Sequence, residues 1–101
     1  MVKNGMRPIH PGEVLREDYL TPLDLSANAL SRALKVPATR INDIVRERRG
    51  VTADTALRLA RYFDTSPQFW LNLQTAHDLR AAEIANGKRI KLEIHPTTKA
   101  A

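Results

Sequence analysis

Residues 26–50, SANALSRALKVPATRINDIVRERRG, contain two short apolar patterns that are separated by only a few residues. In the first pattern, Leu30 and Leu34 are four residues apart and therefore share one face of a helix. In the second, Ile41 and Ile44 are three residues apart, which is again a helical spacing. A run of arginines follows directly. The segment therefore predicts two short helices joined by a tight turn and followed by a basic loop.

This order of elements is the layout of a helix-turn-helix, which places its second helix in the major groove of DNA. The charge of the chain supports that interpretation. The net charge is +5, and the span from Arg32 to Arg61 holds eight basic and three acidic residues, whereas the rest of the chain is balanced. A basic surface attracts a polyanion and releases its counterions on binding. The alternative is an ordinary solvated helix surface.

The composition restricts the other classes of function. A chain of 101 residues with 43% hydrophobic residues is predicted to fold as one domain. The absence of cysteine excludes disulfides and thiolate zinc sites. No apolar run reaches the ~20 residues of a membrane span, and no signal peptide is visible, so we expect a cytoplasmic protein with no membrane partner. The histidines His10, His77 and His95 are scattered, so no enzyme activity, metal or cofactor is expected, and His10 is expected to cap a helix or to pack against one.

Capping residues divide the chain into five predicted helices. The first begins near Pro11 and ends at Thr21-Pro22, and the third begins near Pro37. The other three start after hydroxyl caps at Ser26, Thr52 and Ser66. On the fourth helix, a spacing of i, i+3, i+4, i+7 predicts a buried face, which consists of Ala53, Ala56, Leu57, Ala60 and Phe63.

The end of the chain carries a different pattern. Asn86-Gly87 is a typical helix stop. Beyond it, apolar and charged residues alternate over 90–94, which predicts a short strand. We therefore expect a mobile arm over residues 1–7, the helical domain over 8–87, and a tail over 88–101 that contains this strand. The strand is expected to stay loose, to cross a dimer, or to pair with a sheet edge of a partner.

The outer face of the third predicted helix carries side chains that can address base edges. Thr39 offers a methyl group for thymine and a hydroxyl for an acceptor, and Asn42 can pair with adenine. Arg40 can bind guanine with two hydrogen bonds or hold a phosphate. Asp43 can accept from cytosine or orient a neighbouring arginine.

Residues on either side of this helix are expected to contact the sugar-phosphate backbone. Arg46, Arg48 and Arg49 follow the helix, and contacts of this kind fix register without reading sequence. Ser26 and Asn28 lie at the N-terminus of the first helix of the pair, where their side chains can donate to a flanking phosphate. Ser26 has a simpler alternative role as a helix cap.

Longer motifs surround this segment. The stretch IHPGEVLREDYLTPLDLSANALSRALKVPATRINDIVRERRGVTADTALRLARYFDTSPQFWLNLQ resembles the HigA antitoxin branch of the Xre/Cro-like helix-turn-helix proteins. The likeness runs from about Arg7 to Leu79. The motifs that carry it are HPGEVL, ALSRAL, INDIVRERRGVT, A-x-RLAR-x-F and SPQFWLNLQ, which together are far more specific than a bare helix-turn-helix pattern.

The resemblance implies an all-α, five-helix fold of the lambda-repressor type and a homodimer that binds a palindromic, double-stranded operator. It also implies a partner, a HigB-type toxin that cleaves mRNA. Base reading in the family falls on the positions that are occupied here by Ala38, Thr39, Arg40, Asn42 and Asp43. Two residues depart from the wider superfamily: Lys35 stands at a turn position that is often glycine, and Ser31 at one that is often alanine. Lys35 is strained if the turn requires a positive φ.

Dimerisation requires an apolar surface away from the reading helix. Phe69, Trp70 and Leu73 on the fifth helix are the candidates, because aromatic residues are enriched at interfaces. Both aromatic residues have an alternative place in the monomer core. Three functions thus remain open: an antitoxin that represses its own operon, a transcription regulator without a toxin, and a protein-interaction module with weak DNA affinity.

Overall fold

The computed structural model describes residues 7–98. Within this range the elements are α1 (Pro11–Val14), η1 (Leu15–Leu20), α2 (Ala27–Leu34), α3 (Ala38–Val45), α4 (Ala53–Phe63) and α5 (Pro67–Glu93). Because α1 continues directly into η1, they form one helix, and residues 7–98 contain five helices and no strand. The predicted all-α, five-helix fold is confirmed. Residues 1–6 of the predicted arm and 99–101 of the tail lie outside the described residues.

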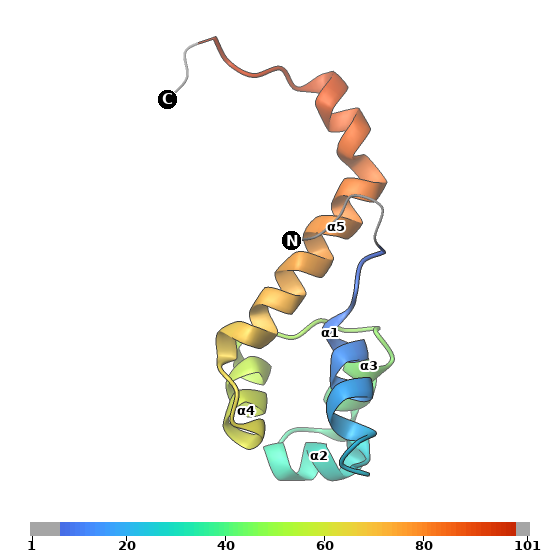
Figure 1. Cartoon of the computed structure of the whole chain (residues 1–101), viewed down its shortest axis with the longest axis vertical. Helices are drawn as coiled ribbons and strands as arrows, with labels where there is room; N and C mark the ends of the chain where they lie inside the picture. The colour runs from blue at the N-terminus through green and yellow to red at the C-terminus, as the bar shows by residue number, and fades with distance from the viewer. Residues whose placement is uncertain (1–6, 99–101) are drawn as a thin grey trace.

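The shorter helices pack together, and α5 extends away from them (Figure 1). α2 packs against α3, and the first part of α5 packs against α4. The second half of α5 projects beyond this body, which makes the molecule 53 Å long but only 27 × 24 Å in cross-section. No helix in residues 7–98 is both long enough and apolar enough to cross a membrane.

Side-chain caps fix where the helices begin. The hydroxyl oxygens of Ser26, Thr52 and Ser66 accept backbone N–H groups at the starts of α2, α4 and α5. At the start of α1, Nδ1 of His10 accepts the N–H of Gly12 at 2.8 Å. These bonds satisfy donors that have no partner inside the helix. The three hydroxyl caps and the capping role of His10 are confirmed.

The second part of the first helix is a π-helix. In η1 the backbone N–H of Thr21 donates to the carbonyl of Arg16, five residues earlier, at 3.0 Å. Leu15 and Leu20, which are also five residues apart, are both buried in the core. The wider turn of a π-helix places residues at this spacing on one side. The unusual turn therefore lets both leucines face the same core.

Trp70 belongs to the core of the monomer. Its side chain is 0% exposed and packs against the rings of Tyr19 and Phe69, with centroids 5.1 and 5.0 Å away. Its indole Nε1 donates to Oγ1 of Thr65 at 2.9 Å. The expectation that Trp70 anchors a dimer is therefore wrong. Its apolar surface is already buried, and its indole N–H is already hydrogen-bonded, within one chain.

The predicted buried face of α4 is partly wrong. Ala56 and Ala60 are buried as expected, but Leu59 and Thr55 complete the face. Leu57 is instead 59% exposed, and Ala53 is exposed as well. The residues 56, 59, 60 and 63 fit a helical spacing as well as the predicted set does, and the position of α5 selects between the two faces.

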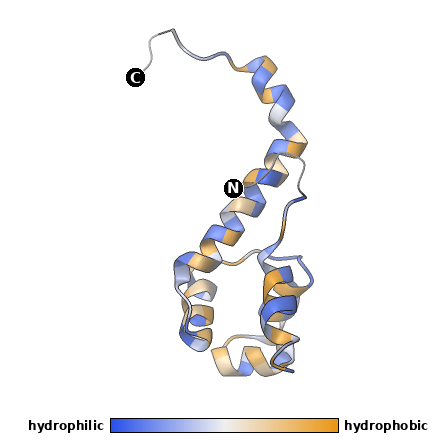
Figure 2. Cartoon of the chain, in the orientation of Figure 1, coloured by the Kyte–Doolittle hydropathy of each residue, from blue (hydrophilic) through white to orange (hydrophobic). Residues whose placement is uncertain are grey.

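The predicted helix stop at Asn86-Gly87 and the strand over 90–94 are wrong. α5 continues through both to Glu93, and only Ile94 adopts an extended conformation. A strand needs a neighbouring strand for its backbone hydrogen bonds, and residues 7–98 offer none, whereas a helix satisfies these groups within itself. Figure 2 shows isolated apolar residues among hydrophilic ones along this projecting half, where Leu79, Ile84 and Leu92 are exposed.

The C-terminal end of α3 is held by two residues of the first helix, Gly12 and Arg16. The backbone of Gly12 lies so close to α3 that an added Cβ would stand 1.8 Å from the carbonyl oxygen of Ile44. A guanidinium N–H of Arg16 donates to the carbonyl of Val45, and another nitrogen of Arg16 lies 3.5 Å from a carboxylate oxygen of Glu47. These contacts fix the position of α3 in the body of the molecule.

We expect Gly12→Ala to destabilise the protein by about 2 kcal/mol, the scale of overpacking in a core, because the new methyl group must push α1 away from α3. Thermal unfolding measures this as a fall in Tm of about 10 °C for a chain of this size. Gly87→Ala is the matched control. Its Cβ would meet only the Cβ of Glu83, at 4.0 Å, so the Tm should stay constant or rise. Equal changes in the two variants would contradict this account.

Candidate nucleic-acid interface

The predicted base-reading residues lie on one helix. Ala38 and Thr39 in the first turn of α3 are exposed, and Arg40, Asn42 and Asp43 are partly exposed. Ile41 and Ile44 on the opposite face of the helix are fully buried. The buried isoleucines thus turn the polar side chains outward, with the N-terminal turn available to a groove.

Three of the polar reading side chains already have a partner within the chain. Nη1 of Arg40 lies 2.6 Å from Oδ2 of Asp54, in the first turn of α4. Nη2 of Arg49, in the loop after α3, lies 3.7 Å from Oδ2 of Asp43. This contact supports the alternative in which Asp43 orients a neighbouring arginine. The third side chain is that of Asn42, which is bonded to Asn28. Much of the reading face is therefore ordered before any ligand binds.

Asn42 connects the reading helix to the start of α2. Its Nδ2 donates to Oδ1 of Asn28 at 2.8 Å and to the carbonyl of Ala38 at 2.8 Å. The Oδ1 of Asn28 is then occupied, whereas no acceptor for its amino group lies among the described residues. Ser26 accepts the N–H of Ala29 at 3.0 Å, which leaves its hydroxyl hydrogen free to donate. Both side chains thus keep a donor for a phosphate.

The turn between α2 and α3 requires a left-handed residue. Lys35 ends α2 with φ 61° and ψ 42°. The turn thus requires a positive φ, and Lys35 adopts the strained conformation that this predicts. Ser31, the other departure, is buried, and its hydroxyl donates to the carbonyl of Ala27 at 2.7 Å. The buried hydroxyl of Ser31 therefore has a hydrogen-bond partner, and serine can replace the usual alanine here.

The basic loop after α3 also contains a left-handed residue. Glu47 has φ 62°, and its N–H donates to the carbonyl of Ile44 at 2.9 Å. Gly50 then passes close to α5, since a Cβ there would lie 2.8 Å from Oε1 of Gln74. The loop is thus closed tightly, which keeps Arg46, Arg48 and Arg49 beside the end of α3.

The positive charge of this region is only partly neutralised inside the chain. Its three acidic residues, Asp43, Glu47 and Asp54, are all ion-paired with arginines. Within residues 7–98, five cations of the same region have no carboxylate within ion-pair distance: Arg32, Lys35, Arg46, Arg48 and Arg61. These free cations are available to a polyanion such as DNA.

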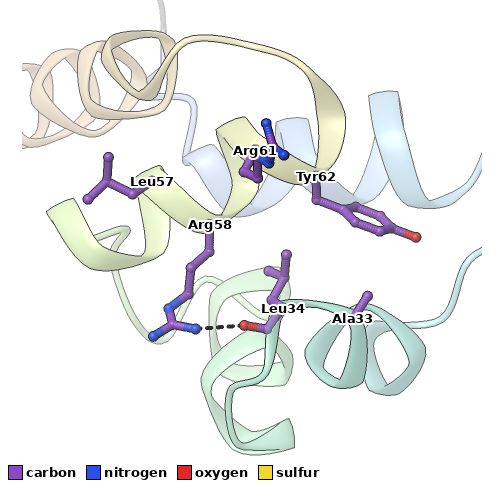
Figure 3. A pocket seen from close by; sticks show the side chains of 6 residues that line it. All are labelled: Ala33, Leu34, Leu57, Arg58, Arg61 and Tyr62. Atoms are coloured by element: carbon purple, nitrogen blue, oxygen red, sulfur yellow. Dashed lines mark hydrogen bonds between the residues drawn. The ribbon is translucent and has the colours of Figure 1, made fainter.

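Three residues that position the site carried no signal in the sequence. Arg16 holds the end of α3, and Asp54 and Arg58 lie beside its start. Arg58 donates to the carbonyl of Leu34 at 2.8 Å across a groove of about 450 Å³ between α2 and α4 (Figure 3). Only the packing of the first helix, α2, α3 and α4 brings these groups together.

Two of the three histidines lie next to each other in the structure. Within residues 7–98 no group of three or more histidine or acidic side chains is placed to hold a metal ion. The rings of His10 and His77 contact edge to face, with centroids 4.9 Å apart. Burial lowers the pKa of His10 below its ordinary value, and the nearby His77 lowers it further. His10 is thus neutral at pH 7, as its role as a hydrogen-bond acceptor requires.

Known proteins share this architecture. Residues 15–70 match the family model that is described as helix-turn-helix. Virulence-associated protein I of Dichelobacter nodosus is 65% identical over 80% of this chain and 75% of its own length. Other similar proteins are named as antitoxins or as helix-turn-helix transcriptional regulators, and none of these names describes an enzyme.

Two solved structures are similar over most of the chain. The antitoxin HigA of Pseudomonas aeruginosa, solved with the higBA promoter, is 61% identical, has a TM-score of 0.87, and is matched over 89% of this chain and 98% of its own. The antitoxin GraA in complex with its operator is 54% identical, has a TM-score of 0.89, and is matched over 98% and 100% of the two chains. The fold is thus that of proteins that have been solved with DNA.

We expect Lys35→Gly to stabilise the protein by about 0.5–1 kcal/mol. Glycine adopts the left-handed conformation without strain, and this gain exceeds the larger conformational entropy that glycine loses on folding. Thermal unfolding without DNA measures the effect as a rise of a few degrees in Tm. Lys35→Ala removes the same charge and keeps the Cβ, so it should give no such rise. Equal Tm values for the two variants would show that the turn carries no strain.

Proposed function

Because the chain belongs to the helix-turn-helix family and to its HigA antitoxin branch, we propose that it is a sequence-specific, DNA-binding antitoxin. In this proposal it represses its own operon as a homodimer and neutralises a HigB-type ribonuclease toxin that cleaves mRNA. The observation that carries the DNA half is the outward polar face of α3, surrounded by cations that have no carboxylate partner within residues 7–98. A protein with this function would work in the cytoplasm, where its operator DNA lies.

We propose that α3 enters the major groove with its N-terminal turn first. The base-reading set is then Ala38, Thr39, Arg40, Asn42 and Asp43. The sugar-phosphate backbone would be held by Ser26, Asn28, Arg46, Arg48 and Arg49. The free donors on Ser26 and Asn28 support this division, since a helix N-terminus favours a phosphate. Relatives solved with promoter or operator DNA support the DNA-binding role of the fold.

The proposed dimer follows from the size of the reading surface. One helix-turn-helix covers a half-site, and two copies about one turn of DNA apart read a palindrome. Phe69, which is 36% exposed, and Leu73, which packs on the edge of the core, remain candidates for the contact between copies. Both lie on α5, whereas the reading residues lie on α3.

We expect Arg48→Ala to weaken binding to operator and to unrelated duplexes by the same factor, because a phosphate contact carries no sequence information. The slope of log K against log salt should become shallower by about one unit. Fluorescence anisotropy at several salt concentrations measures both quantities. Arg89→Ala, on the projecting half of α5, removes the same charge and should change neither. An Arg48 variant with unchanged affinity and slope would count against this DNA-binding surface.

The toxin half of the proposal rests on the relatives, one of which was solved with a higBA promoter. We expect the tagged protein to co-purify with the product of a neighbouring gene when the two are expressed together, and to suppress the mRNA cleavage by that product. The main alternative is a transcription regulator without a toxin partner. If the protein binds its upstream promoter but no neighbouring gene product is bound or neutralised, that alternative is correct.

A further inference from the structure

The carboxylate of Asp54 connects three helices of the candidate interface. Its Oδ2 lies 2.6 Å from Nη1 of Arg40 on α3 and 2.9 Å from Nε of Arg58 on α4. Arg58 in turn donates from Nη1 to the carbonyl of Leu34, the last residue of α2 (Figure 3). One carboxylate oxygen is thus fixed between the start of the reading helix and the end of the helix before it.

This arrangement restricts the guanidinium of Arg40. An unrestrained arginine side chain has several rotatable bonds and loses much freedom when it is ordered. Reading of guanine by arginine requires two parallel N–H donors in a defined plane. The bond to Asp54 uses Nη1, and no acceptor for Nη2 or Nε of Arg40 lies among the described residues. Two nitrogens, Nη2 and Nε, therefore keep all their N–H donors on a guanidinium that is already oriented.

Electrostatics alone does not account for a carboxylate at this position. A negative charge close to DNA opposes binding to phosphates. Hydrogen bonds from Arg58 and then from Arg40 lower the pKa of Asp54 below its ordinary value, so the carboxylate stays charged at neutral pH. An ion pair this exposed also adds little to stability. The remaining effect of the carboxylate is on the geometry of Arg40.

We propose that Asp54 is a specificity-determining residue that positions Arg40 for one base pair of each half-site. The proposal rests on the proposed function, in which α3 reads DNA. Without Asp54, Arg40 is free to turn toward the nearest phosphate. The protein then holds DNA at least as tightly but distinguishes the base at that position poorly.

The test compares Asp54→Asn with the wild type. A binding site is first selected by the wild-type protein from a random duplex library, and affinities are then measured for that site and for each single base-pair substitution. We expect Asp54→Asn to lower discrimination about tenfold at one position per half-site, the scale of one good arginine–guanine pair. Its affinity for unrelated duplex should rise, and its salt slope should steepen by about one unit, because the released Arg40 neutralises one more phosphate.

Asp64→Asn is the matched control, since it makes the same charge change at the other end of α4 and asparagine tolerates the left-handed conformation there. It should leave discrimination at every position unchanged. Thermal unfolding confirms that both variants are folded. A structural role for Asp54 would weaken all duplexes alike, and a purely electrostatic role would strengthen all alike. Either result, with discrimination unchanged, overturns the proposal.

A double-mutant cycle tests whether Asp54 acts through Arg40. In the Arg40→Ala background, Asp54→Asn should no longer change discrimination at that position. A loss of equal size in both backgrounds would overturn the proposal, since Asp54 would then act independently. If the wild-type protein selects no sequence from the library, the proposed DNA reading itself fails, and this inference fails with it. Selection by the wild type with full discrimination in Asp54→Asn overturns the inference alone.

Discussion

The close approach of Gly12 to the carbonyl of Ile44 positions the reading helix. Because no side chain separates the two backbones, α1 lies directly against the last turn of α3, and Arg16 binds the carbonyl of the next residue. The C-terminal end of α3 is thereby fixed in the body, and its N-terminal turn is left at the surface. A helix held in this way presents its first turns to a groove, as a major-groove reader must.

The start of α3 is ordered by side chains rather than by backbone packing. Asp54 holds Arg40, and Asn28 holds Asn42, so two reading residues are tied to neighbouring helices before DNA arrives. Binding to a surface that is already ordered loses less conformational entropy than binding to mobile side chains. The same partners satisfy polar groups on the free protein. The contacts of Asp54 and Asn28 thus order the reading face around the start of α3.

Local sequence signals predicted the helices well because their causes are local. The caps at Ser26, Thr52 and Ser66 involve residues only three apart. The failures have non-local causes: the burial of Trp70 and the exposure of Leu57 depend on how α4 and α5 pack, and the helix over 90–93 forms because no strand within residues 7–98 is available to pair. Arg16 and Asp54 act on residues 29 and 14 positions away, which no short pattern reveals. The base-reading and phosphate-binding roles of individual residues remain predictions.

The most direct measurement of the central claim is an NMR titration of the labelled protein with the duplex that it selects. We expect amide shift changes concentrated in the first turns of α2 and α3 and in the loop over residues 46–50. Additional amide shift changes on α5 would indicate contact between two copies of the protein and not contact with DNA. Shift changes that leave α3 unaffected and cluster on the projecting half of α5 would contradict the claim that α3 reads DNA.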